Sequence, residues 1–504
     1  MLQKFVKSIE IVCFMCYSKE KTNGDVNMKK AKIAVVTLGH YIYFQQFEGL
    51  REELMAKADS FKEYLDKDLC DIADAGFVDC VDEAFEAVKF LKKEDIDMLF
   101  VLMSTYVPSA VCAPFARYLD VPQILVGIQP LEHLDYSNTT TYIQLANDDI
   151  CAMPEVTGVY ERFGKKMPAC IVASSSQKDY IRREVNEWVR AASAMAAFKY
   201  ETFGYLGHTY EGMYDMHTDP TAFTSTFGAH VKMLEMCELV KNCEEAADDE
   251  ISNQIEEIKS IFEICNPSVD PLTDFVHDED LELSSRISVA LKKLVDTHKL
   301  TALAYYYKSE PGNTYEQIAA NLIIGNTLLT SAGIPLAGEA DLKTAAAMLI
   351  MKNIGGGGSF AEIHPFDVES DVVLIGHDGP HNIAIANGKP RLRKLKKYHG
   401  KSGSGIGVEF SLKSGPITLL SISLDRNGKF RMIAAEGESL PGEIPQTGNT
   451  NTRVSFGCPV CEFLEHWCEA GPTHHLALGT GHHMKTLRKF AKISGIELIE
   501  VKIR

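Results

Sequence analysis

The sequence predicts an α/β protein that ends in a mostly antiparallel β domain. In its first part, continuous apolar runs alternate with stretches of helical periodicity, which is typical of a parallel sheet covered on both faces. After about residue 367, short strands alternate with Gly, Asn and Lys turns. The chain has 504 residues, which is enough for roughly two to four domains with buried cores.

The first part is predicted to form a parallel sheet. Apolar runs indicate strands at residues 32–38, 97–103, 122–126 and 168–173, and residues 47–65 have helical periodicity. Binding loops of such sheets lie at the carboxyl ends of the strands. Here those loops begin at Gly39, Ser104 and Gly127, although ordinary turns explain them equally well.

Long amphipathic helices are expected in the middle of the chain. The pattern predicts a strand at 301–305 and helices at 180–200, 229–265, 278–298 and 315–331. An aromatic, glycine-containing stretch runs from Gly204 to His208 and continues through Tyr210, Tyr214 and His217. This stretch either lines a sugar pocket or forms a packing corner, and the packing corner is slightly favoured.

The last part is predicted to be rich in strands, with a hairpin turn at Asp425-Arg426-Asn427-Gly428 and one late helix near 483–493. The strands are expected at residues 371–375, 407–412, 416–424, 429–435 and 496–503. These patterns predict an N-terminal extension (1–27), an N-terminal α/β domain (28–174), a central α/β domain (175–358) and a C-terminal β domain (359–504).

Composition excludes some classes of partner. The net charge of −18 and the pI near 5.4 argue against nucleic acid and anionic membranes, which favour a basic protein face. Thirteen cysteines without a secretory signal are typical of reduced thiols, so a cytoplasmic location is expected. The apolar run at residues 9–17 is too short to span a bilayer, and no longer run of that kind follows.

Several motifs suggest other sites but fit poorly. The run from Gly355 to Gly358 lacks the Lys-Ser/Thr of a phosphate loop, and Gly400-Lys401-Ser402 has Leu395 at the first glycine position of that pattern. Cys458 and Cys461, followed by His466 and Cys468, are the best rival metal or redox site. A second matching pair is absent nearby, so ordinary thiols are the preferred interpretation.

Four residues have the chemistry of one divalent metal site: Glu339, Glu362, His377 and His475. Two carboxylates and two neutral imidazoles balance a 2+ charge and leave coordination positions open for a substrate. Their spacing follows no short ligand rule, so the sequence pattern alone does not show that they meet.

The segments around these residues resemble those of bacterial L-arabinose isomerases. Residues 338–346 (GEADLKTAA) are similar to that family's GEGDWKTAA, and 359–362 (SFAE) to its SFMED. Residues 373–377 (VLIGH) resemble LVLGxH, and 471–475 (GPTHH) resemble GGAHH. The four segments are collinear, and a weaker likeness extends over roughly residues 30–500. Motifs of this kind are specific for the superfamily, which includes the L-fucose isomerases.

The resemblance implies a metal-dependent aldose–ketose isomerase that acts on a free monosaccharide through a cis-enediol. It implies two Rossmann-like or flavodoxin-like α/β domains, a C-terminal antiparallel β-barrel, and a homotrimer or homohexamer with active sites between subunits. Glu339, Glu362, His377 and His475 would bind Mn²⁺, with Co²⁺ or Mg²⁺ as alternatives. The second histidine of the pair is the family's ligand, which favours His475 over His474.

The same resemblance suggests roles in catalysis and sugar binding. Glu339 and Glu362 would act as acid and base, and either could abstract the proton. The weaker candidates for substrate binding are Tyr41, Gln129, His364 and His474.

The sugar-contacting surroundings depart from the family pattern. Leu342 replaces the family's tryptophan, Ile363-His364-Pro365 replaces its acidic and aromatic neighbours, and no histidine occurs in residues 146–154. His40-Tyr41 stands in the family's glutamine-containing loop. Another pentose, a hexose or a deoxysugar is therefore as compatible as arabinose. An L-fucose-type isomerase, a sugar epimerase and a non-catalytic sugar-binding or regulatory protein are the alternatives, and the intact ligand set favours the enzymes.

Overall fold

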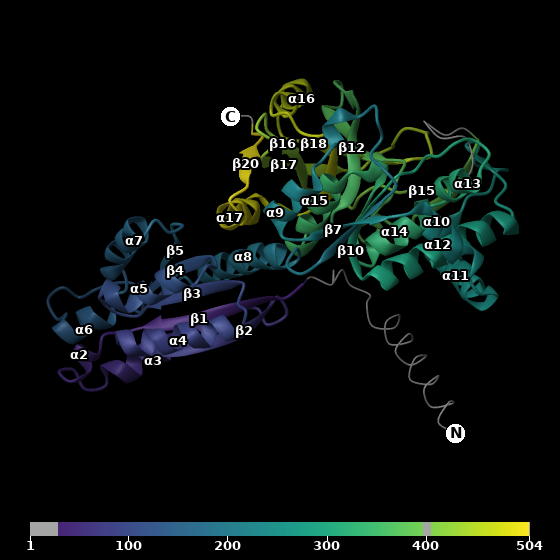
Figure 1. Cartoon of the computed structure of the whole chain (residues 1–504). Coiled ribbons are helices and arrows are strands. Elements are labelled where there is room, and N and C mark those ends of the chain that lie inside the picture. The colour runs from purple at the N-terminus through teal and green to yellow at the C-terminus, as the bar shows by residue number, and fades with distance from the viewer. Residues whose placement is uncertain (1–28, 397–404, 503–504) are drawn as a thin grey trace. The chain divides into compact units, whose positions relative to one another are not determined.

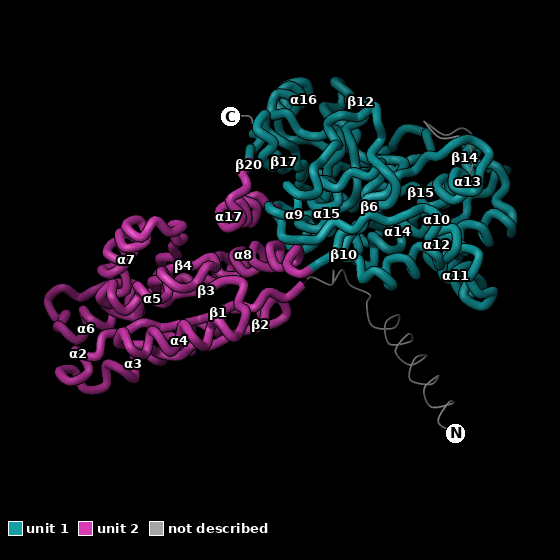
Figure 2. The backbone as a smooth tube through the Cα atoms, viewed as in Figure 1, with its two compact units in different colours: residues 1–27, 201–482, 499–504 teal, residues 28–200, 483–498 magenta. Residues whose placement is uncertain are grey.

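The computed structural model describes residues 29–396 and 405–502, which divide into two compact units (Figure 2). Unit 1 comprises residues 201–482 with 499–502, and unit 2 comprises 29–200 with 483–498. The predicted extension at residues 1–27 lies outside the described residues. None of the helices in the described ranges combines the length and the apolar character needed to cross a membrane.

Unit 2 is built on a five-stranded parallel sheet with the order β2-β1-β3-β4-β5 (Figure 1). This is the flavodoxin-like order, and it confirms the parallel sheet predicted for the first part. The strands are β1 (Ala31–Leu38), β2 (Cys70–Val78), β3 (Met98–Met103), β4 (Gln123–Gln129) and β5 (Ala169–Ser174). Strand β2 escaped prediction because it is an edge strand whose apolar residues are interrupted by Asp71 and Asp74.

Helices cover both faces of this sheet. The residues Leu99 and Val101 of β3 belong to the cluster formed with α4, α5 and α7, whereas Phe100 between them packs on Phe61 of α3 at 5.4 Å between ring centroids. Alternate residues of a strand point to opposite faces, which explains the division. The helices of the unit are α2 (Tyr41–Phe44), α3 (Leu50–Lys62), α4 (Val81–Lys93), α5 (Ser109–Tyr118), α6 (Thr141–Ala146), α7 (Ala152–Arg162), α8 (Lys178–Ala196) and α17 (Met484–Ser494).

Helix α17 belongs to unit 2 although it lies near the end of the chain. Lys489 forms an ion pair with Glu184 of α8 at 2.9 Å, and Leu487 and Phe490 are fully buried. Sequence analysis assigns this helix to the C-terminal β domain, because periodicity identifies an apolar face but not the element that covers it. The predicted domain boundaries themselves remain predictions.

Unit 1 contains a four-stranded parallel sheet with the order β11-β10-β6-β7. Its strands are β6 (Thr202–Leu206), β7 (His230–Leu234), β10 (Leu300–Tyr305) and β11 (Leu336–Ala337). The helical segments are η1 (Tyr214–Met216), α9 (Pro220–Phe227), α10 (Met236–Glu244), α11 (Asp248–Ile261), α12 (Asp278–His298), α13 (Thr314–Ala320), α14 (Ile323–Ser331), η2 (Gly338–Ala340) and α15 (Leu342–Asn353).

Two predicted helices of this region were wrong in extent. Residues 229–265 form β7, α10, α11 and the short strand β8 (Glu263–Ile264) instead of one helix. The break before α11 is capped, since Glu250 accepts a hydrogen bond from the Ala247 backbone at 3.1 Å. Residues 315–331 are divided between α13 and α14 at Asn321, whose side chain donates to the Gln317 carbonyl at 2.8 Å. Such local side-chain bonds compete with helix continuation.

The C-terminal part forms a large sheet with the order β16-β19-β12-β13-β18-β17-β20, in which β16 also pairs with β17. The pairings among β12, β13, β16, β17, β18 and β19 in this sheet are antiparallel. The predicted hairpin joins β16 to β17. Closure into a barrel remains a prediction here. The strands are β12 (Ser359–Asp367), β13 (Val372–His377), β16 (Gly415–Leu424), β17 (Phe430–Leu440), β18 (Thr450–Ser455), β19 (His475–Thr480) and β20 (Glu497–Glu500).

A small sheet pairs β14 (Arg391–Leu395) with β15 (Gly407–Glu409), β8 and β9 (Thr273–Asp274). The short helices of this part are η3 (Ile383–Ile385) and α16 (Val460–Glu469). Strands β12, β14, β18 and β19 were not predicted from the sequence. These strands are short or interrupted by polar residues, and two of them carry predicted metal ligands, so their chemistry masks the apolar pattern.

Candidate metal centre

The four predicted ligands come from segments that tertiary structure brings together in unit 1. Glu339 lies in η2, directly after β11, and Glu362, His377 and His475 lie on β12, β13 and β19. Strand β12 runs between the other two, so Glu362 pairs with His475 on one side and with Gly376, the neighbour of His377, on the other. Ladder pairing therefore explains why ligands so far apart in sequence are neighbours.

His475 is the common member of two groups that could each hold a metal ion. One group contains Glu362, His377 and His475, and the other contains Glu339, His474 and His475. Within each group the candidate ligand atoms lie within 4.8 Å of one another. Glu339 Oε2 is 3.4 Å from His475 Nε2, and Glu362 Oε1 is 4.0 Å from His377 Nε2. The four predicted ligands thus converge, while metal binding itself stays a prediction.

The chemistry of the donor atoms fits a divalent cation. Glu339 Oε2 and His475 Nε2 are buried and have no hydrogen-bond partner among the described residues. Buried polar atoms are nearly always satisfied, so two such atoms facing each other are unusual. Two ligand atoms that are each about 2.1 Å from one ion, at right angles, lie about 3 Å apart. The 3.4 Å separation of Oε2 and Nε2 is close to this value.

Asp341 orients the imidazole of His475. Its Oδ2 is 3.2 Å from His475 Nδ1, which places the proton of the neutral ring on Nδ1 and leaves Nε2 as an acceptor. Burial lowers the pKa of His475, with Asp341 opposing, so the ring is neutral as a metal ligand must be. Burial opposes the charge on Asp341, but Lys343 and the hydrogen bonds from His475 and Thr344 hold the pKa of this carboxyl well below its usual range.

Asp341 also begins helix α15. Its side chain accepts hydrogen bonds from the backbone N–H groups of Lys343 and Thr344, both at 3.1 Å. A carboxylate in this position satisfies the free N–H groups of the first helical turn and is stabilised by the helix dipole. The same carboxylate therefore fixes the start of α15 and one candidate ligand.

Glu339 adopts a conformation that is unfavourable for a residue with a side chain. Its φ is +60°, and the following Ala340 has a φ of +57°. Each such residue costs of order 1 kcal/mol or more, and backbone strain of this kind is concentrated at functional sites. Burial raises the pKa of Glu339 to about 7, with His474 lowering it and the nearby charge of Glu362 raising it.

His377 has two different neighbours at its Nδ1. The Gly379 backbone N–H donates to this nitrogen at 2.8 Å, and Asp378 Oδ1 lies 3.3 Å from it. Nδ1 is thus an acceptor in this structure, and ligation of an ion through Nε2 would require the ring proton to move to Nδ1, where Asp378 Oδ1 would replace the Gly379 N–H as its partner. Sequence analysis did not single out Asp378, because only its position beside a candidate ligand identifies it.

His474 is held by Asp215, a residue that sequence analysis did not identify. Asp215 Oδ2 accepts from the His474 backbone N–H at 2.9 Å and lies 2.7 Å from its Nδ1. Burial lowers the pKa of His474, but the hydrogen bond and charge of Asp215 raise it above its usual value overall. The Nε2 of His474 is 3.9 Å from Glu339 Oε2, so this ring borders the centre.

The aromatic stretch that begins at Gly204 lies beside the same centre. Its Tyr210 backbone N–H donates to the Glu339 carbonyl at 3.4 Å, and Asp215 in η1 holds His474. His208 packs on Tyr306 at 4.1 Å between ring centroids. The stretch therefore packs against Glu339 and Tyr306 and supplies Asp215 to the candidate site, while a role in lining a sugar pocket remains a prediction.

The weaker candidates for substrate binding lie in both units. His364 on β12 has its Nε2 3.9 Å from Glu362 Oε1, so it lies next to the predicted ligands. Tyr41 and Gln129 belong to unit 2, where Tyr41 is half-exposed at the start of α2 and Gln129 donates to the Leu131 carbonyl at 2.7 Å. A role in substrate binding remains a prediction for each of them.

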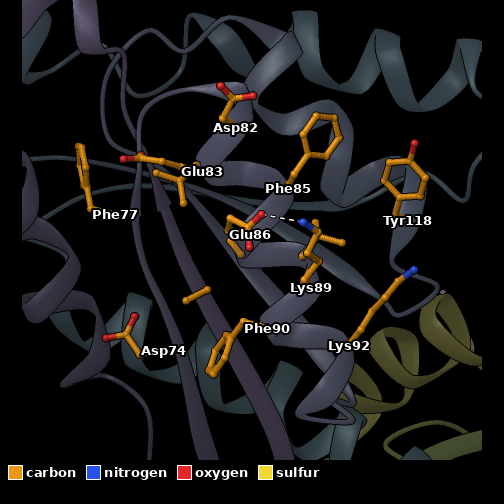
Figure 3. Close-up of a pocket in the computed structure, with 14 residues that line it drawn as sticks. Asp74, Phe77, Asp82, Glu83, Phe85, Glu86, Lys89, Phe90, Lys92 and Tyr118 are labelled. Atoms are coloured by element: carbon orange, nitrogen blue, oxygen red, sulfur yellow. Dashed lines mark hydrogen bonds and ion pairs between the residues drawn. The ribbon is translucent and has the colours of Figure 1, made fainter.

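The other candidate sites have less support. Cys458 and Cys461 are free and belong to none of the metal-capable groups found in the described ranges. A third such group, Asp79, Cys80 and Glu83, is at least partly exposed. A wide groove of about 1020 Å³ in unit 2 lies along β2 and α4 and contains the Glu86–Lys89 ion pair, but none of the predicted site residues (Figure 3).

Two domain models of one protein family match successive segments of the chain. A family model of the L-arabinose isomerase central domain matches residues 176–357, and one of the C-terminal domain matches residues 357–497. The chain belongs to the L-arabinose isomerase family. This membership confirms the resemblance that the four motifs indicate, and the two matched segments contain all four predicted ligands.

Individual members of the family are distant in sequence. An L-arabinose isomerase of Saccharophagus degradans is 24% identical over 338 residues, which cover 66% of either chain. L-arabinose isomerase 1 of Bacillus licheniformis is 21% identical over 434 residues, covering 84% of this chain and 83% of the relative. A sulfoquinovose isomerase of Priestia megaterium is 20% identical over 332 residues, covering 66% of this chain and 71% of the relative.

Proposed function

We propose that the protein is a metal-dependent aldose–ketose isomerase acting on a free monosaccharide. The observation that carries this proposal is the facing pair of buried, unpartnered atoms, Glu339 Oε2 and His475 Nε2, with Glu362 and His377 beside them. Membership of the family and the names of the three relatives described above, each an isomerase of a sugar, support the same reaction class.

Glu339, Glu362, His377 and His475 would hold the ion, with Mn²⁺ proposed first and Co²⁺ or Mg²⁺ as alternatives. The two carboxylates suit Mn²⁺ and Mg²⁺, whereas the two imidazoles favour a transition metal such as Mn²⁺ or Co²⁺ over Mg²⁺. When bound, a divalent ion polarises the substrate carbonyl and stabilises negative charge on the neighbouring oxygens.

The two carboxyl groups supply the proton transfers of the reaction. One takes the proton from C2 of the open-chain aldose while O1 gains a proton, which gives the cis-enediol. A proton is then delivered to C1 and the O2 hydroxyl loses its proton, which gives the ketose with no net gain or loss. Burial raises the pKa of Glu339 to about 7 without an ion, and a bound divalent ion would lower this pKa and favour the carboxylate, the form that accepts a proton.

We also propose that the large sheet closes into the antiparallel barrel expected for this family. The pairing of β16 with both β19 and β17 supports closure, because it leaves neither β16 nor β17 as a free edge. Assembly into a homotrimer or homohexamer is proposed from the family resemblance alone.

The sugar is best identified by an activity panel. The purified full chain, stripped with a chelator and reloaded with Mn²⁺, Co²⁺ or Mg²⁺, is assayed for ketose formation from aldopentoses, aldohexoses, deoxysugars and sulfoquinovose. Conversion of at least one aldose that depends on the added ion is expected. If no aldose is converted while sugars still raise the melting temperature, the protein is a non-catalytic sugar-binding homologue and the proposal is wrong.

A further inference from the structure

The adjacent histidines of the centre are each held by a separate carboxylate. Asp341 holds His475 through Nδ1, and Asp215 holds His474 through Nδ1 and through the backbone N–H. The two carboxylates come from different segments, since Asp341 begins α15 whereas Asp215 lies in η1. Something must keep these segments in register, because an error of 1 Å in a ligand is enough to weaken a metal site.

Lys343 connects the two segments. Its side chain is completely buried, and its Nζ donates to the Met216 carbonyl at 2.7 Å and to Thr218 Oγ1 at 3.0 Å. The same Nζ is 3.8 Å from Asp341 Oδ1. The lysine thus contacts the carboxylate that holds His475, and it contacts the backbone one residue after the carboxylate that holds His474.

We infer that Lys343 is a positioning residue that sets the orientation of both histidines, through Asp341 on one side and through the Asp215–Thr218 segment on the other. This inference rests on the proposed metal-dependent function. A buried ammonium group is costly unless it is paired and hydrogen-bonded. Its partners Met216, Thr218 and Asp341 belong to the two segments that hold the histidines, so the buried ammonium group joins these segments.

Lys352 provides a matched control on the same helix. It lies in the last turn of α15, is also largely buried, and donates to the Gly333 carbonyl at 2.6 Å. Glu201 is the charged group that raises its pKa against the effect of burial, and its hydrogen bond within the described residues is to Gly333 and not to either histidine or their carboxylates. A lysine with only a structural role should behave as Lys352 does.

The test compares Lys343→Met with Lys352→Met in the full chain. Binding of Mn²⁺ alone is measured by titration calorimetry, and the melting temperature of the chelated protein by circular dichroism. Loss of residues that orient metal ligands typically weakens metal affinity by about 10- to 100-fold. We expect a loss of this size for K343M and a change of less than about threefold for K352M, even where their melting temperatures fall equally. Equal Mn²⁺ affinities of K343M and the wild type would overturn the inference.

Two further variants test the Asp341–His475 contact and the Asp215–His474 contact separately. They remain informative if K343M does not fold. Asp341→Asn should weaken Mn²⁺ binding by about tenfold or more, because its single oxygen accepts from the Lys343 and Thr344 N–H groups and its NH2 then faces His475 Nδ1, which favours the wrong tautomer. Asp215→Asn should leave Mn²⁺ affinity within about threefold and instead raise KM for the converted aldose, because His474 borders the centre without being a proposed ligand. Equal effects of the two variants on Mn²⁺ binding would overturn the two-sided arrangement.

The wild type distinguishes this inference from the proposed function. If the wild type binds Mn²⁺ but converts no aldose, the proposed isomerase activity is wrong, whereas a selective loss of Mn²⁺ affinity in K343M still supports the positioning role.

Discussion

Glu339 concentrates several unfavourable features in one residue. It has a positive φ, a buried carboxylate oxygen without a partner, and a pKa raised to about 7. Proteins keep such residues when the strained, desolvated state serves binding or catalysis. The next carboxylate along the chain, Asp341, is fully buried but has a lowered pKa, because Lys343 and several hydrogen-bond donors surround it. The pKa values of two acids that are two residues apart are therefore shifted in opposite directions by their surroundings.

Replacing Glu339 with Gln tests its proposed chemistry. The amide keeps the shape of the side chain but can neither exchange a proton nor carry a negative charge. Turnover should fall by at least about 10²-fold, the usual contribution of a positioned acid or base, while the melting temperature of the chelated protein is kept or raised. Glu438→Gln, at a half-exposed carboxylate on β17, is the control and should leave turnover unchanged. Retained activity in E339Q would remove Glu339 from the mechanism.

Lys352 gives a pH dependence with a defined sign. Burial lowers its pKa from 10.5 to about 8, with Glu201 opposing. The folded state therefore disfavours the charged form of Lys352. The free energy of unfolding is highest above pH 10.5, where the lysine is neutral in both states, and it decreases as the pH falls from 10.5 through about 8.

The stability of the wild type relative to Lys352→Met should consequently rise by roughly 1–3 kcal/mol between pH 8 and 10.5. Urea unfolding of both proteins across this interval measures the difference, in which the contributions of other titrating groups cancel. A stability difference that does not change with pH would show that the charge of Lys352 is not penalised in the folded protein.

At the scale of elements, the close pairing of β13 and β18 sets the place of His377. A Cβ built on Gly376 would lie 1.8 Å from the Thr450 carbonyl oxygen, which is backbone and cannot rotate away. Glycine is required here so that the two strands approach closely just before a candidate ligand. The absence of a side chain at Gly376 thus allows the strand pairing that positions His377.

Gly376→Ala should therefore destabilise the protein by at least about 3 kcal/mol, in the range of a severe core clash, and weaken Mn²⁺ binding. Gly158→Ala is a suitable control, because Gly158 lies inside α7 and its Cβ would meet no atom within 4 Å. That change should be neutral or stabilising by up to about 1 kcal/mol. Denaturant unfolding measures both, and similar stabilities of the two variants would contradict the close-approach argument.

For the whole molecule, the division into two units predicts separate responses to metal. All four proposed ligands lie in unit 1, whereas α17 completes unit 2 by packing on α8. Addition of Mn²⁺ at about 100 times its Kd stabilises the state that binds it by about 2.7 kcal/mol. Calorimetric melting should therefore show a metal-dependent rise in the transition of unit 1.

Phe490→Ala should instead lower the transition of unit 2, because it removes a fully buried side chain of α17 and costs about 3–5 kcal/mol. Peptides released by limited proteolysis during heating assign each transition to its unit. If Mn²⁺ and F490A shift the same transition, the two units do not unfold separately.

Much of the parallel sheet of unit 2 was predictable because buried strands are continuous apolar runs. The helix at residues 278–298 was predicted with its observed bounds, since its amphipathic pattern is uninterrupted. Prediction failed where polar residues interrupt the pattern, as at edge strand β2, or where side chains divide a helical region, as at Asn321. Local periodicity indicates which residues of one element are buried, but it does not indicate which other element packs against them.

The sequence by itself determined the family and the residue types of the four-ligand set, because ordered motifs preserve chemistry even at low identity. Only the tertiary structure decided how these residues are supported. Asp215 lies 259 positions before His474, and Lys343 reaches Met216 across 127 positions. Such contacts follow no spacing rule, since they depend on how separate segments pack, and this packing determines which carboxylate orients each histidine.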